Sequence, residues 1–285
     1  MRPIPQRIAE ELSCRPEQVI ATIEMLNEGS TVPFIARYRK EKTGGLDDTQ
    51  LRTLEERLRY LTELEERRSS VLESIREQEK LTPELEKAIN EADTKTRLED
   101  LYLPYKPKRR TKAQIAREAG LEPLADALLE NRELIPEKAA ERYINEDKGI
   151  NDTVAALEGA RQIIMERISE NAGLLAELRE RVWQQGILQS RVLNGKEKEG
   201  VKFRDYFDYR EAINKIPSHR ALALFRGRNE NALNLTLIPS ADDETPHQYY
   251  EQAVALHLEI NNPTRPTELW LVETARYAWK IKLFT

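Results

Sequence analysis

Cysteine is nearly absent from this sequence of 285 residues, in which Cys14 is the only one. A single cysteine cannot close a disulfide within the chain and cannot supply a structural zinc site. Long apolar runs are absent too, since no stretch of about 18 apolar residues occurs, and residues 1–5 lack the apolar core of a signal peptide. These absences exclude a disulfide-stabilised scaffold and predict a cytoplasmic protein with no membrane partner.

The signatures of common enzyme classes are also missing. The sequence contains no glycine-rich phosphate loop, no Gly-x-Ser-x-Gly elbow and no His-Glu-x-x-His motif. Its three histidines, His219, His247 and His257, lie in different segments, without the cysteine or acidic spacing that marks a metal site. We therefore expect no catalysis, no metal, no cofactor and no small-molecule substrate.

Acidic side chains slightly outnumber basic ones. The sequence has 45 basic and 50 acidic residues, and its net charge of −5 excludes a basic chromatin-type protein. Charged residues make up 33% of the chain, and the mean hydropathy is −0.68. Such a composition is typical of long helices with solvent-facing Glu, Lys and Arg. At about 150 residues per domain, the length predicts two domains.

Apolar residues recur at helical spacing over most of the chain. Short helices are predicted over residues 6–12, 16–28, 34–40, 82–92, 246–260 and 268–284. Residues 112–120 and 121–129 form two more, joined by a glycine turn. This pair resembles a helix-turn-helix only in outline.

Two longer helical patterns organise these elements. The first runs from Asp47 to about residue 80, and Glu65 and Arg68 interrupt its apolar seam. We interpret it as part of a structural helical hairpin rather than a charged recognition surface, because mixed charges usually mark a solvated face. The second runs over residues 151–193, where three glycines weaken it and leave a continuous or a kinked helix open.

The character of the sequence changes after this second pattern. Residues 194–200 contain no apolar side chain and two glycines, which predicts a linker. Beyond it, Leu233, Leu235 and Leu237 alternate with other residues and form the only convincing strand.

Together these patterns predict the fold. We expect a mainly α-helical scaffold with long central helices and a small strand-containing element near residues 231–238. The linker divides it into a helical domain over residues 1–194 and a second, mostly helical segment over residues 201–285.

Basic clusters stand out against this acidic background. Six cations and no acidic residue fall between positions 106 and 117. Such a patch is a candidate phosphate-binding footprint. We assign phosphate contacts to Lys106, Lys108, Arg109, Arg110 and Lys112. The alternative, that these cations pair with neighbouring acidic helices, stays open.

Two tyrosines, Tyr102 and Tyr105, stand just before this patch. Exposed aromatic rings would stack on bases, whereas buried rings would anchor a loop braced by prolines. We favour the buried interpretation.

A second cluster, Arg37, Arg39 and Lys40, lies at the end of a short predicted helix. Cations at that place interact favourably with the helix dipole, so these three are second choices for nucleic-acid contact. A third basic element spans residues 218–220 and 225–228. For this element we favour internal salt bridges.

Three long segments carry a family resemblance. They are TVPFIARYRKE at residues 31–41, LEDLYLPYKPKRR at 98–110, and KFRDYFDY at 202–209 followed by IPSHR at 216–220. With these segments the sequence resembles the Tex family of bacterial transcription accessory proteins, which is related to the eukaryotic elongation factor of the Spt type. The resemblance implies an N-terminal fragment of a longer protein. Such proteins continue with a ribonuclease H-like domain generally regarded as lacking nuclease activity, helix-hairpin-helix elements and an RNA-binding barrel of OB type.

The function implied by this resemblance is non-catalytic support of transcription by a scaffold that binds nucleic acid, RNA or DNA, chiefly through the later domains. Proteins of the transcription machinery are the other expected partners. The alternative is a protein-interaction module that docks the transcription machinery or the protein's own downstream domains and has no nucleic-acid affinity. A third and weaker hypothesis is support of a nuclease-like domain downstream.

Overall fold

The chain folds as two compact units, Met1–Lys106 and Pro107–Thr285. A computed structural model describes residues 2–107, 109–240, 245–260 and 263–284. Each unit has an apolar core of its own. The class is mainly α-helical with a small sheet, as the sequence predicts.

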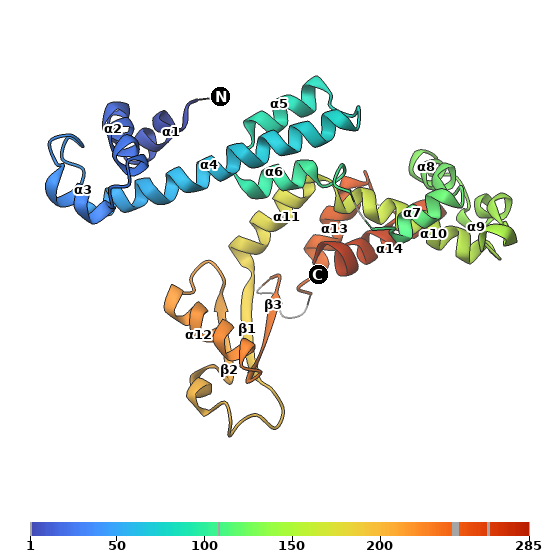
Figure 1. The fold of residues 1–285 in the computed structure, drawn as a ribbon. Coiled ribbons are helices and arrows are strands. Elements are labelled where there is room, and N and C mark those ends of the chain that lie inside the picture. Colours follow the sequence, from blue (N-terminus) through green and yellow to red (C-terminus); the bar gives the residue numbers. More distant parts are fainter. Residues whose placement is uncertain (1, 108, 241–244, 261–262, 285) are drawn as a thin grey trace. The chain divides into compact units, whose positions relative to one another are not determined.

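The first unit is organised by one long helix, α4 (Asp48–Glu77). The Asp47 carboxylate caps it by accepting a hydrogen bond from the Gln50 backbone N–H at 2.8 Å, and the Gln50 side chain accepts one from the Asp47 N–H at 3.1 Å. Figure 1 shows the shorter helices along α4, namely α1 (Ile4–Glu11), α2 (Pro16–Asn27), α3 (Val32–Tyr38), α5 (Pro83–Glu91) and α6 (Lys95–Tyr102).

The charged pair in the seam of α4 fastens the next helix. Arg68 is 3% exposed, and its guanidinium donates to the carbonyls of Ile89 and, at 2.8 Å, Ala92. It also binds Glu65 at 3.0 Å. The two carbonyls lie at the end of α5, where a helix lacks intrahelical donors. Helix α5 therefore folds back on α4, and the two helices form the structural hairpin expected from the sequence.

The second unit is built around α10 (Thr153–Ser169), which is buried on most sides. Gly159 allows a close approach here, because a Cβ at this position would lie 2.2 Å from Leu121 Cδ1. The surrounding helices are α7 (Lys112–Glu118), α8 (Glu122–Glu130), α9 (Pro136–Ala140), η1 (Glu141–Tyr143), η2 (Glu146–Lys148), α11 (Ala172–Gln185), α13 (Gln248–His257), α14 (Pro266–Ala278) and the π-helical turn η4 (Trp279–Leu283).

The helical pattern over residues 151–193, for which a continuous and a kinked helix were both left open, consists of two separate helices followed by a strand. Helix α10 ends at Ser169, and Asn171 caps α11 by accepting a hydrogen bond from Leu174 N at 2.9 Å. Helix α11 itself ends at Gln185. At Gly186 a Cβ would lie 2.4 Å from the Val182 carbonyl oxygen, so glycine permits the sharp change from helix to strand.

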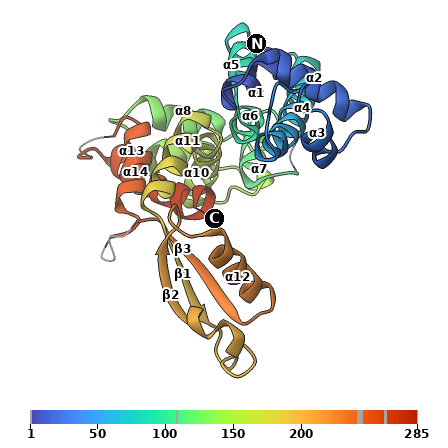
Figure 2. The ribbon, with the colours of Figure 1, turned by 90° about the vertical axis from the view of Figure 1, so that its left-hand side faces the viewer.

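A three-stranded antiparallel sheet follows. Strand β1 (Ile187–Val192) lies between β2 (Asp208–Ala212) and β3 (Leu233–Ile238). Helix α12 (Ser218–Asn229) covers one face of it (Figure 2). The turn η3 (Val201–Tyr206) completes the element.

The strand predicted near residues 231–238 is confirmed as β3, whereas β1 and β2 were missed. Residues 194–200, predicted as the domain linker, form a turn between β1 and η3 inside the second unit. The division between the two compact units falls at Lys106 and Pro107 instead.

Candidate nucleic-acid interface

The basic segment over residues 106–117 crosses the division between the two units, so Lys106 belongs to the first unit and the later cations belong to the second. Lys106 closes the first unit, and its Nζ lies 4.0 Å from Glu99 Oε2. Glu99 also accepts a hydrogen bond from Arg67 Nε at 2.6 Å. This bond holds the pKa of Glu99 below its usual value, so the carboxylate stays ionised beside Lys106. Lys108 lies outside the described residues.

The two tyrosines before this segment serve the fold. Tyr102 is 6% exposed, and its hydroxyl lies 3.0 Å from Ser74 Oγ. Tyr105 packs against the same core, and its carbonyl accepts a hydrogen bond from Gln78 Nε2 at 2.9 Å. The buried interpretation is therefore confirmed for Tyr102, whereas Tyr105 is half-buried.

The cations at the start of the second unit differ in their partners. Arg110 donates to Glu118 from Nε at 3.1 Å and from Nη2 at 2.5 Å. These bonds lower the pKa of Glu118. Arg109 and Lys112 are exposed. Their side chains form no hydrogen bond or ion pair with any of the described residues. Only part of this cluster is therefore available to a phosphate.

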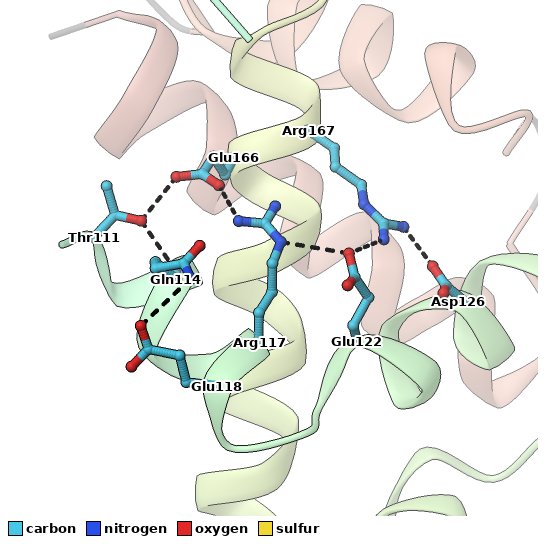
Figure 3. Close-up of polar contacts among 8 residues, drawn as sticks. All are labelled: Thr111, Gln114, Arg117, Glu118, Glu122, Asp126, Glu166 and Arg167. Carbon is cyan, nitrogen blue, oxygen red and sulfur yellow. Dashed lines mark hydrogen bonds and ion pairs between the residues drawn. The ribbon is translucent and has the colours of Figure 1, made fainter. Parts of the chain in front are cut away.

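Arg117, the last cation of the segment, is structural (Figure 3). Its guanidinium donates to Glu166 at 2.6 Å and to Glu122 at 3.4 Å. The guanidinium of Arg167 also donates to Glu122, at 2.9 Å, and to Asp126, at 2.6 Å. These bonds fasten α7 and α8 to α10. Thr111, the N-cap of α7, donates to Glu166 at 2.9 Å and accepts from the Gln114 N–H at 3.0 Å.

The second cluster lies where α3 ends and a loop leads to α4. Arg37, Arg39 and Lys40 are all exposed, and the following Lys42 is exposed as well. None of the four has a carboxylate partner among the residues that the structure describes. Arg39 donates to the Tyr38 carbonyl at 3.3 Å, and its guanidinium lies 5.3 Å from the centre of the Phe34 ring.

This loop has a fixed conformation. Gln18 of α2 donates from Nε2 to the carbonyl oxygens of Thr43 at 2.7 Å and Gly44 at 3.1 Å. Thr43 is fully buried, and its hydroxyl donates to the Lys40 carbonyl at 3.2 Å. Gly44 has φ +60° and Gly45 has φ +90°, values that glycine adopts at little cost. Arg39, Lys40 and Lys42 therefore lie on a loop that is held in place by hydrogen bonds within the first unit.

The third basic element pairs within the protein, as favoured from the sequence. Arg220 binds Glu211 at 3.1 Å, and Arg226 binds Glu230 at 2.9 Å. The guanidinium of Arg228 lies 5.0 Å from the centre of the Phe225 ring. Helix α12 thus presents fewer unpaired cations than its sequence indicates.

The ranking of the two main clusters changes with the structure. The segment given first choice has Lys106 and Arg110 beside carboxylates, whereas the second choice has no carboxylate partner among the described residues. Lys42, which belongs to the same run of the sequence, was not among the contact residues chosen from it. Its signal was present, since residues 37–42 contain four cations and one acidic residue.

Two features are not found among the residues that the structure describes. Within the described ranges, no group of three or more His, Cys, Asp or Glu side chains gathers as a metal site would require. None of the helices in the described part of the chain is both long and apolar enough to cross a membrane.

The sequence is similar to known proteins over nearly its whole length. Residues 2–76 match the family model described as Tex-like protein N-terminal domain, and residues 131–285 match the one described as Tex central region-like. The chain is 57% identical over 278 residues to Protein YhgF of Escherichia coli (strain K12). The aligned region is 97% of this chain and 36% of that protein.

Other relatives show the same partial coverage. The Transcriptional accessory protein Tex of Neisseria gonorrhoeae is 53% identical over 279 residues, 97% of this chain and 36% of that protein. The human S1 RNA-binding domain-containing protein 1 is 30% identical over 240 residues, 81% of this chain and 24% of that protein. The chain therefore spans about a third or less of the length of these curated relatives.

Proposed function

Because the chain belongs to the Tex family, in which it supplies the N-terminal and central regions, we propose that it is a non-catalytic scaffold that supports transcription by binding the nucleic-acid backbone. The ligand is RNA or DNA, contacted through phosphate groups. Proteins of the transcription machinery are the partners that this scaffold would assist.

The unpaired cations at the end of α3 and in the following loop carry this proposal. Like charges that stand close together repel one another, and each would be more stable beside a carboxylate. The end of α3 and the loop nevertheless hold Arg37, Arg39, Lys40 and Lys42 exposed, without a carboxylate partner among the described residues. A polyanion would relieve this repulsion, and release of its counterions would drive binding.

Arg109 and Lys112 provide a second contact, on the other unit. Both are exposed and lack a side-chain partner among the described residues. Lys106 and Arg110 contribute less, because Glu99 and Glu118 already offset their charges. The proposal therefore transfers the main role from the first cluster to the second.

The test is fluorescence anisotropy of the 285-residue chain with labelled RNA and DNA over a salt series. The variant Arg37→Glu/Arg39→Glu/Lys40→Glu should weaken binding to every sequence. Each lost phosphate contact removes about 0.7 to 0.9 from the magnitude of the slope of log affinity against log salt concentration, so three lost contacts should reduce that magnitude by roughly 2 to 3.

A matched control carries the same change in net charge elsewhere. Lys87, Lys138 and Lys198 are exposed, and their triple replacement by Glu should leave the slope nearly unchanged. An equal loss in both triple variants would mean that only overall charge matters. No binding by the unaltered chain at low salt would reject the proposal and favour the protein-interaction alternative.

A further inference from the structure

Helix α3 has one buried face and one aromatic face. Val32 and Ile35 are 4% and 0% exposed and pack into the core of the first unit. Phe34 and Tyr38 point away from that core and are 39% and 61% exposed. Large aromatic side chains are normally buried or placed at binding surfaces. Two neighbouring aromatic rings on this face are therefore open to contact with a ligand.

The two aromatic rings form one surface with the unpaired cations. Phe34 and Tyr38 are four residues apart, so they lie on the same side of the helix, with ring centres 5.3 Å apart and planes inclined by 46°. The Arg39 guanidinium lies over the Phe34 ring at 5.3 Å. Arg37 is three residues from Phe34 and shares its side of the helix.

We infer that this surface binds single-stranded nucleic acid, with unpaired bases stacked on Tyr38 and Phe34 and phosphates bound by Arg37, Lys40 and Lys42. The inference rests on the proposed function and makes the ligand more specific. A base has a flat π surface that stacks on an aromatic ring whatever its sequence. In a duplex both surfaces of each base are already covered by neighbouring bases, so the rings would add little.

The charge of the surface favours nucleic acid over a protein partner. Between Thr31 and Leu46 the sequence has four cations and a single acidic residue, Glu41. Arg37 lies on α3, and the loop that carries the other three cations is held by Gln18 and by buried Thr43, so little conformational freedom is lost on binding. Cations beside aromatic rings on a fixed surface are the combination that single strands require.

The test compares a labelled oligonucleotide of about 12 residues, a length within the range of one binding module, with the duplex of the same sequence. The variants are Phe34→Leu and Tyr38→Leu, which keep an apolar side chain but remove the ring. Each should weaken single-strand binding by about 5- to 150-fold, the effect of losing one stacked base. Duplex binding and the salt slope should not change, because no phosphate contact is lost.

Two controls make the result specific to stacking. Tyr38→Phe keeps the ring and should retain most of the single-strand affinity. An oligonucleotide with the same phosphates but abasic positions should bind the unaltered chain as weakly as it binds Tyr38→Leu. Because both residues are exposed, the leucine variants should unfold at the same temperature as the unaltered chain.

The outcomes separate this inference from the proposed function. Weaker binding in the Arg37→Glu/Arg39→Glu/Lys40→Glu variant with no effect of either leucine variant would overturn the stacking surface and leave phosphate binding intact. An equal loss for duplex and single strand in Tyr38→Leu would also overturn it. Absence of any binding by the unaltered chain would overturn both.

Discussion

Trp279 donates a hydrogen bond from its indole Nε1 to Nδ1 of His247 at 3.0 Å. The same indole stacks on Tyr250, with ring centres 4.4 Å apart. The Tyr250 hydroxyl donates to the Pro239 carbonyl at 2.6 Å, directly after β3. These bonds tie the turn η4, helix α13 and the end of the sheet together, and they require His247 to keep an unprotonated Nδ1.

This requirement predicts a pH dependence of stability. Burial lowers the pKa of His247, Lys280 lowers it further, and Glu251 opposes them. The pKa in the folded chain therefore lies below the unfolded value of about 6.5, so the unfolded state takes up more protons as the pH falls. The stabilisation is complete above about pH 6.5 and is lost as the pH decreases below it.

Urea unfolding at about pH 7.5 and about pH 5.5, on either side of the unfolded pKa, measures this effect. His247→Gln keeps an acceptor for Trp279 but does not titrate, so its stability should change less between the two pH values. The hydrogen bond from Arg265 lowers the pKa of Glu268 to about 2. The contribution of Glu268 to the stability of the folded chain is therefore lost only below about pH 4.5, outside the range of this comparison. An identical pH dependence in both chains would contradict the role of His247.

Replacement of Arg68 by methionine should destabilise the first unit. The change leaves the buried carbonyls of Ile89 and Ala92 without the donor that they have in the folded chain. We expect the free energy of unfolding to fall by about 1–3 kcal/mol, measured by urea unfolding. Arg76→Met, on an exposed position of the same helix, should stay within about 0.5 kcal/mol of the unaltered chain.

The substitution Gly159→Ala should destabilise the second unit although alanine favours helices. Helix propensity alone would gain about 1 kcal/mol. The new Cβ would lie 2.2 Å from Leu121 Cδ1 and 3.3 Å from Ala116 Cβ, and overpacking costs about 1–3 kcal/mol. A double-mutant cycle with Leu121→Ala measures the clash, because the leucine change should cost less in the Gly159→Ala variant than in the unaltered chain. Additive effects would show that the helices relax freely.

Loosening the cationic loop should weaken nucleic-acid binding without removing any charge. Gln18→Ala deletes the donor to the carbonyls of Thr43 and Gly44, so binding would have to order the loop. We expect a few-fold loss of affinity with an unchanged salt slope, measured by anisotropy. Gln6→Ala changes an exposed glutamine elsewhere in the first unit and should have no effect.

Local signals account for much of what the sequence predicts about the helices. Thr82, Thr111 and Asp152 each accept a backbone hydrogen bond at the start of a helix that the sequence predicts, and such caps can be recognised without tertiary information. Strand β1 could not be recognised in this way. Its sequence, ILQSRV, continues a helical pattern, and only pairing with the distant strands β2 and β3 makes it a strand.

For the candidate site, too, some features follow from local sequence and others only from tertiary structure. Runs of cations are visible in the sequence, but their partners depend on how the chain folds. Arg110 pairs with Glu118, whereas Arg37 has no carboxylate partner among the described residues. The exposure of Tyr38 and the burial of Tyr102 are equally a result of packing. Local pattern therefore located the charges, whereas tertiary structure decided which of them a ligand can reach.

The junction at Gly186 has a mechanical consequence. One residue joins α11 to β1; its N–H bonds to the Val182 carbonyl at 2.7 Å, and its carbonyl accepts the Ile213 N–H at 2.9 Å, just after β2. Both backbone polar groups of this single connecting residue are therefore hydrogen-bonded, which leaves the connection little freedom to bend. A force applied to the sheet should therefore be transmitted directly to α11, and the two elements should rotate together as one rigid body.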